Sequence, residues 1–197
     1  MSTRLTVPVG PHDHRQGPDD APLSLVEYGD FECPYCGRAY PVVKSIQRRL
    51  GDRLQLVYRH FPLTQLHPHA ELAAEASEAA ATRGRFWEMH DTIFENQQAL
   101  EPRDLVGYAA RLGIDPASVA SALSTHAFAD RVREHFVSGV RSGVNGTPTF
   151  FINGVRHDDS WDEATLLAAL QSHQFAGPRL RRPRRRPGRS PARSPPR

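Results

Sequence analysis

The feature that most constrains the fold is a pair of cysteines that directly follows a strand-like apolar run. Residues 23–28 are nearly continuously apolar, which predicts a strand covered on both faces. Cys33 and Cys36 are the only cysteines among 197 residues, and Pro34 between them favours the first turn of a helix. Apolar residues at helical spacing continue that helix, namely Val42, Val43, Ile46 and Leu50. Residues 54–59 predict a second strand, so both cysteines lie at the helix start of a β-α-β unit.

The rest of the chain predicts a helical block and then a second sheet segment. Residues 64–142 read as an inserted block with apolar residues at helical spacing. Helices are expected there over residues 70–81, 86–94, 105–112 and 128–140. Strands are expected at 149–152 and 155–157, joined by an Asn-Gly pair typical of a tight hairpin turn, and a last helix at 161–173. The predicted order is β-α-β, helical block, β-β-α.

The two ends of the chain differ in character. Residues 4–9 suggest a short strand, and residues 10–22, rich in His, Asp, Gly and Pro, suggest a surface loop. The folded domain is expected to occupy residues 1–177. Residues 178–197 carry nine arginines with many prolines and are expected to be disordered. Without those arginines the formal net charge falls from +3 to about −6.

Composition also bears on location and partners. The first residues are charged and carry no apolar signal-peptide core, which predicts a cytoplasmic protein. No run approaches the roughly 18 apolar residues of a membrane helix, so no membrane association is expected. The arginine-rich tail could attract nucleic acid through salt-sensitive contacts. It lacks aromatic residues for base stacking, so such binding is expected to be nonspecific at most.

The cysteine spacing points to redox chemistry. Unpaired backbone N–H groups and the macrodipole at a helix N-terminus favour an anion, so the Cys33 thiolate is favoured. Cys33 is then the exposed nucleophile that attacks a substrate disulfide, and Cys36, one turn inward, resolves the mixed disulfide. Run backwards, the same steps oxidise a dithiol. No cofactor is expected beyond the cysteine pair.

Three other interpretations concern the cysteines and the histidines. The cysteines could be two buried apolar side chains. They could bind zinc, but this needs four ligands and the chain has no second Cys-x-x-Cys. His60, His67 and His69 cluster in sequence, yet they fall at a strand end and in a loop, so their side chains need not converge. No metal site is expected.

Two motifs together carry a resemblance to a known family. The first is Glu27-Tyr28-Gly29-Asp30-Phe31-Glu32-Cys33-Pro34-Tyr35-Cys36, and the second is Gly146-Thr147-Pro148-Thr149-Phe150-Phe151-Ile152-Asn153-Gly154. Over residues 21–173 the chain resembles the DsbA-like branch of the thioredoxin-fold disulfide oxidoreductases. The resemblance implies an α/β, thioredoxin-like fold with an inserted helical domain.

The resemblance also implies roles for single residues. Pro148 would be a cis-proline facing the cysteines, and Thr147 would present its backbone to an extended substrate peptide. Pro34 and Tyr35 would border the same substrate site, and Glu32 and Tyr35 would tune the cysteine pair without being essential. Glu27 matches a buried acid that relays the proton Cys36 must lose. A surface-facing glutamate is the alternative, because the facing of the strand is ambiguous.

These observations predict a thiol–disulfide oxidoreductase. Its substrates would be protein, peptide or small thiols and disulfides, and another thiol system would exchange electrons with it. The Pro-Tyr dipeptide resembles glutaredoxins, so a glutathione-linked reductase remains an alternative. A noncatalytic peptide-binding or chaperone module, and a nucleic-acid binder driven by the tail, are rivals from other classes.

Overall fold

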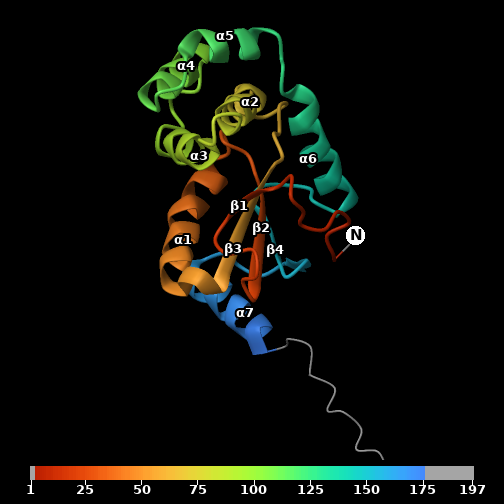
Figure 1. Ribbon diagram of the computed structural model, residues 1–197. Helices are drawn as coiled ribbons and strands as arrows, with labels where there is room; N and C mark the ends of the chain where they lie inside the picture. The colour runs from red at the N-terminus through yellow and green to blue at the C-terminus, as the bar shows by residue number, and fades with distance from the viewer. Residues whose placement is uncertain (1–2, 176–197) are drawn as a thin grey trace, which may run out of the picture.

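A five-stranded sheet forms the centre of the computed structural model, which describes residues 3–175 (Figure 1). The strands are β1 (His14–Gln16), β2 (Leu23–Gly29), β3 (Leu54–His60), β4 (Thr149–Ile152) and β5 (Val155–His157). Their order across the sheet is β1-β3-β2-β4-β5. β2 and β3 are parallel, and the other neighbouring pairs are antiparallel. The tail predicted over residues 178–197 lies outside the described residues.

Helices cover the sheet and extend one end of it. They are α1 (Pro34–Leu50), a 3-10 turn (Gly51–Arg53), α2 (Ala70–Ala81), α3 (Phe86–Glu95), α4 (Pro102–Arg111), α5 (Pro116–Ser124), α6 (Ala129–Arg141) and α7 (Glu163–Phe175). Helices α2–α5 form a block above the sheet in Figure 1, and α6 returns from it to the sheet. The predicted order of β-α-β, helices and β-β-α is confirmed.

Three buried clusters hold these layers together. On one face, Leu25 and Phe150 of the sheet pack with Ile46 of α1 and Leu166 of α7. The other face packs against α6, where Gly139 permits a close approach because a Cβ there would lie 2.7 Å from a Phe61 ring carbon. The third cluster joins the sheet end to the helical block, and it contains both cysteines. The cysteine pair therefore lies where the two parts of the fold meet.

The prediction for the N-terminal segment is wrong. Residues 4–9 form no strand beyond an isolated bridge between Arg4 and Val155, and β1 lies instead within the expected loop. The buried Arg59 guanidinium explains the difference, because it donates to the carbonyl oxygens of Val7 and Pro8 at 2.9 and 3.1 Å. It also forms a two-point ion pair with Asp13. These carbonyls are therefore directed at a side chain rather than at a neighbouring strand.

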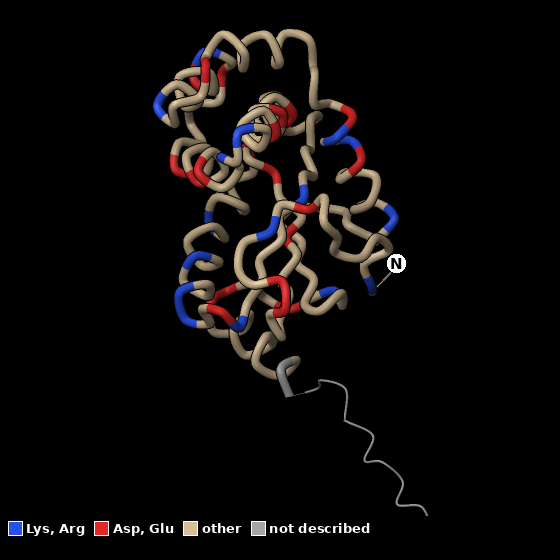
Figure 2. Tube along the Cα trace, viewed as in Figure 1, with Lys and Arg blue, Asp and Glu red and all other residues tan. Residues whose placement is uncertain are grey.

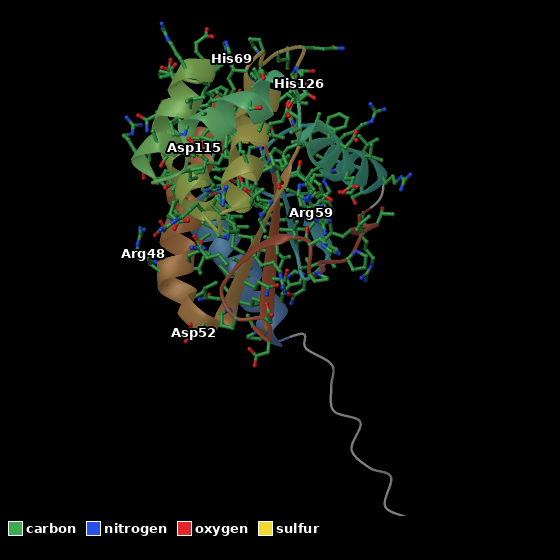
Figure 3. The ribbon with its side chains drawn as sticks, turned by 45° about the horizontal axis from the view of Figure 1, so that its top comes forward. Arg48, Asp52, Arg59, His69, Asp115 and His126 are labelled. Atoms are coloured by element: carbon green, nitrogen blue, oxygen red, sulfur yellow. The ribbon has the colours of Figure 1, made fainter. Side chains whose placement is uncertain are left out.

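The helical block contains one helix that was not predicted, α5. The Asp115 side chain caps it by accepting from the backbone N–H groups of Ala117 and Ser118 at 3.2 Å, and Pro116 occupies its first turn. Figure 3 places Asp115 in the helical block. The apolar pattern was too short to indicate α5, but the Asp-Pro start signal was present.

Candidate active site

The two cysteines lie at the start of α1, as predicted. Cys33 is the N-cap residue and Cys36 lies in the first turn, and both are free thiols. Cys33 is only 3% exposed and Cys36 is fully buried. The expectation of an exposed nucleophile is therefore wrong. The segment around Thr147 covers the Cys33 sulfur, which lies 3.4 Å from the Thr147 carbonyl oxygen.

The two sulfurs have different surroundings, and their pKa values are therefore shifted in opposite directions. A hydrogen bond from the Cys36 thiol is the largest influence on Cys33, and with backbone N–H groups of the first turn it outweighs burial and lowers the pKa of Cys33 to about 5. Burial, and then donation of that same hydrogen bond, raise the pKa of Cys36 well above its ordinary value. At neutral pH one sulfur is a thiolate and its neighbour is a thiol.

Glu27 lies beneath the pair on β2 and faces the interior. Its side chain is 3% exposed, and its Oε1 has no hydrogen-bond partner among residues 3–175. Burial raises the pKa of Glu27 to about 8, and the negative charge of Cys33 adds to the effect. Of the two orientations left open for this glutamate, the structure has the buried one. The carboxyl is therefore mostly protonated at pH 7 and able to exchange a proton near neutrality.

Asp30 organises the loop that precedes the helix. Its side chain is buried, and its Oδ1 accepts from the backbone N–H groups of Glu32 and Cys33 at 2.8 and 3.2 Å. Its Oδ2 accepts from the Leu63 N–H and contacts His67 Nδ1, both at 2.8 Å. Asp30 was not among the predicted site residues, although an Asp placed ahead of a helix start is a common cap for backbone N–H groups.

The three histidines that cluster in sequence contact different carboxylates and share none. His67 contacts Asp30, and His69 contacts Glu32, each through Nδ1 at 2.8 Å. The backbone N–H of His69 also donates to Glu32, at 2.6 Å. His60 instead contacts Glu78 on α2. His67 and His69 therefore fasten the segment after β3 to the cysteine loop.

Gln97, in the segment after α3, holds the loop from the helical block. Its Nε2 donates to the carbonyl oxygens of Phe31 and Cys33 at 2.7 and 3.0 Å. Gly37 leaves room for this arrangement, because a Cβ at that position would overlap the Gln97 side-chain oxygen. No sequence motif marks Gln97, since its two partners lie more than sixty residues earlier in the chain.

The surface beside the cysteines combines exposed apolar groups with backbone. The Thr147–Pro148 peptide bond is cis. Pro34 begins α1, and the following Tyr35 is 55% exposed with the Arg38 guanidinium 4.5 Å from its ring centre. Leu66, in the segment held by His67, is 73% exposed. The Thr147 carbonyl oxygen and the exposed Tyr35 therefore lie near Cys33, one in space and the other two residues along the chain.

A thioredoxin-like sheet, a cysteine pair at the start of its first long helix and a helical block before the closing hairpin define the DsbA-like class of fold. The chain belongs to the thioredoxin family, because a family model described as thioredoxin matches residues 10–172. The predicted fold class and family resemblance are confirmed. Within residues 3–175, no helix has the length and apolar character required to cross a bilayer.

Two solved structures share this fold, and curated proteins match the chain in sequence. BdbD from Bacillus subtilis is 24% identical with a TM-score of 0.74, over 82% of this chain and 92% of that one. A thioredoxin-like oxidoreductase from Silicibacter pomeroyi is 23% identical with a TM-score of 0.72, over 84% and 94%. A Salinispora arenicola protein named Na(+)/H(+) antiporter NhaA 1 is 49% identical over 178 residues, or 90% of this chain. The chain spans only 27% of that relative's length.

Proposed function

We propose that this chain is a thiol–disulfide oxidoreductase in which Cys33 is the nucleophile and Cys36 the resolving thiol. The observation that carries the proposal is the contrast between the two sulfurs. The pKa of Cys33 is lowered to about 5 while that of Cys36 is raised, and the two share a hydrogen bond. A structural pair of apolar thiols would have no reason for this contrast.

The reaction conserves electrons in two exchange steps. The Cys33 thiolate attacks one sulfur of a substrate disulfide, a mixed disulfide forms, and the other substrate sulfur leaves as a thiolate. Cys36 then loses its proton and attacks Cys33, which releases the second substrate thiolate and leaves a Cys33–Cys36 disulfide. A dithiol from another redox system restores the pair. In reverse, the same steps oxidise a substrate dithiol.

Glu27 supports the second step. Cys36 is buried and has a raised pKa, so its proton needs an acceptor inside the protein. Ionised Glu27 interacts electrostatically with Cys36, and a carboxyl whose pKa is about 8 can both take and return a proton near pH 7. We assign Glu27 the role of proton relay.

The surface beside Cys33 favours protein or peptide substrates. Thr147 offers backbone groups to an extended chain, and the exposed Tyr35 and Leu66 offer apolar contacts. A glutathione-linked activity stays an alternative, and so does a noncatalytic peptide-binding module. The cytoplasmic location stays a prediction.

Insulin reduction by dithiothreitol tests the catalytic proposal. The wild-type chain should accelerate the reaction and Cys33→Ser should abolish the acceleration, because the attacking thiolate is lost. Cys36→Ala should accumulate mixed disulfides that a reductant releases, and Cys33→Ser/Cys36→Ala should form none. Equal activity in Cys33→Ser would exclude the mechanism. A wild type without activity, together with a Cys36→Ala variant that captures nothing, would favour the binding module.

The curated relatives favour one particular setting for this activity. Eight of them are each named a Na(+)/H(+) antiporter, and this chain matches only 27–28% of the length of each. We propose that the domain exchanges disulfides beside an ion antiporter. Disulfide capture by Cys36→Ala in membranes with and without the antiporter tests this, and capture that is the same in both membranes would count against it.

A further inference from the structure

A second group of ionisable side chains lies where β1, β3 and α2 meet. His14 lies on β1, His60 ends β3, and Glu78 lies on α2. The Nε2 atoms of His14 and His60 lie 2.7 and 2.9 Å from the same carboxylate oxygen, Glu78 Oε1. The three potential ligand atoms all lie within 4.8 Å of one another. One oxygen thus brings together two imidazoles from different strands.

The group is mostly buried, but one of its three side chains is partly exposed to solvent. His60 and Glu78 are 1% and 5% exposed, whereas the His14 side chain retains 13% of its surface. The His14 ring is held by stacking on Phe86, with centroids 3.5 Å apart and planes within 4°. Ionised groups at such depth are generally paired or bound to metal. His14 therefore combines a fixed ring orientation with a route for an ion from solvent.

A third imidazole lies against this group from α6. The His135 ring lies 5.3 Å from the His60 ring and 6.1 Å from the His14 ring. Its Nδ1 accepts from the His60 backbone N–H, while its buried Nε2 has no partner within the described part of the chain. His60 Nδ1 is also without a partner among those residues. Hydrogen bonds between these residues therefore leave two buried nitrogens unsatisfied.

We propose that His14, His60 and Glu78 bind a divalent transition-metal ion such as Zn²⁺, at a site separate from the cysteine pair. Two imidazoles and a carboxylate are a ligand set that zinc uses in sites that keep an open fourth position. Ligand atoms about 2.1 Å from a tetrahedral ion lie about 3.4 Å apart, so the observed contacts need to lengthen by less than about 1 Å. The metal replaces the imidazole protons now directed at Glu78.

The charges around the group are mixed. α2 supplies only acidic charge, since Glu71, Glu75 and Glu78 have no basic neighbour on that helix (Figure 2). Arg131 of α6 opposes a cation, with its Nε 3.9 Å from Glu78 Oε1. Arg131 is 25% exposed, contacts Glu134 at 3.3 Å and donates to the His12 carbonyl oxygen, so Glu78 is one of several partners of its guanidinium. Its removal should strengthen metal binding.

Metal titration of the tag-free full chain tests the site. The protein is first oxidised, so that Cys33 and Cys36 are joined in a disulfide and cannot bind metal as thiolates. Calorimetry with Zn²⁺ should show one equivalent bound, and Co²⁺ should give the visible absorption of a four- or five-coordinate site. His14→Ala and Glu78→Gln should each weaken binding at least tenfold, and Arg131→Gln should strengthen it several-fold.

A second His–Glu pair, whose glutamate also lies on α2, provides a matched control. His126 contacts Glu75 at 2.8 Å, and Figure 3 places His126 in the helical block. His126→Ala should leave the affinity unchanged, because this pair supplies only two ligands. Thermal unfolding verifies that each variant is folded, and His14→Ala retains the contact between His60 and Glu78. Absence of Zn²⁺ uptake by the folded wild type, or full affinity in folded His14→Ala, would overturn the proposal.

Discussion

Glu27 and Cys33 give opposite pH dependences to the stability of the reduced protein. Burial raises the pKa of Glu27 from 4.5 to about 8, so its contribution is fully present below pH 4.5 and is lost as the pH rises to 8. The hydrogen bond from Cys36 lowers the pKa of Cys33 from 9.0 to about 5, so its contribution is present above pH 9 and is lost as the pH falls to 5. Between pH 5 and 8, the Glu27 contribution to the free energy of unfolding falls with pH while the Cys33 contribution rises, and the two changes nearly cancel.

Replacing Glu27 should reveal the pH dependence that Cys33 alone gives to the free energy of unfolding. In reduced Glu27→Gln, the free energy of unfolding relative to wild type should grow with pH between 5 and 8, by up to about 1.4 kcal/mol per pH unit. Urea unfolding under a phosphine reductant at several pH values measures this difference. Cys33→Ser should show the opposite trend relative to wild type. A Glu27→Gln difference that is flat across this range would mean that Glu27 is ionised throughout, and would remove its role as proton relay.

The hydrogen bonds of Gln97 predict that the helical block supports the active site. Gln97→Ala removes two hydrogen bonds to the carbonyls of Phe31 and Cys33, each worth about 0.5–1.5 kcal/mol, and should lower the free energy of unfolding by about 1–3 kcal/mol. The rate of insulin reduction should also fall, because the first turn of α1 loses a fixed partner. The neighbouring Gln98 is exposed, so Gln98→Ala is the matched control. Equal stability in the two variants would contradict this role.

Elements with a strong local pattern were predicted, and elements defined by distant partners were not. β2, α1 and β3 follow from an apolar run, a Pro-initiated helix and a second apolar run. β1 could not be predicted, because it depends on pairing with β3 and on Arg59 binding the preceding segment. In the same way, Cys33 and Cys36 were evident from their spacing, whereas Asp30 and Gln97 act through partners that only the fold supplies.

The group of His14, His60 and Glu78 also depends on partners that are distant in sequence, so sequence patterns did not reveal it. The expectation of no metal site considered His60 with His67 and His69, which are its neighbours in sequence. In the fold, His60 meets His14 and Glu78 instead, because β1 pairs with β3 and α2 packs above the end of the sheet. The register of an edge strand cannot be read from three residues, so this group was out of reach of sequence patterns.

At the scale of the whole molecule, the active site is formed where several separate parts of the fold meet. The sheet contributes Glu27, α1 contributes the cysteines, the helical block contributes Gln97, and the segment before β4 contributes Thr147. Gln97 and Thr147 contact the loop or the sulfur of Cys33, and Glu27 interacts with Cys33 electrostatically. Stabilisation of its thiolate is therefore a property of the complete reduced fold, and it disappears when the two sulfurs form a disulfide.

This arrangement predicts that the disulfide fails to stabilise the protein at neutral pH. At pH 7, lowering the pKa of Cys33 from 9.0 to about 5 stabilises the reduced fold by about 3 kcal/mol. The Cys33–Cys36 disulfide closes a very short loop, and it therefore stabilises the oxidised fold by only about 2 kcal/mol. Urea unfolding should therefore find the reduced form at least as stable at pH 7, and the oxidised form more stable near pH 5, where the thiolate contribution is lost. Glu27 is present in both forms, so its effect largely cancels in the comparison. A difference between the two forms that is independent of pH from 5 to 8 would show that the Cys33 thiolate is not stabilised by the fold.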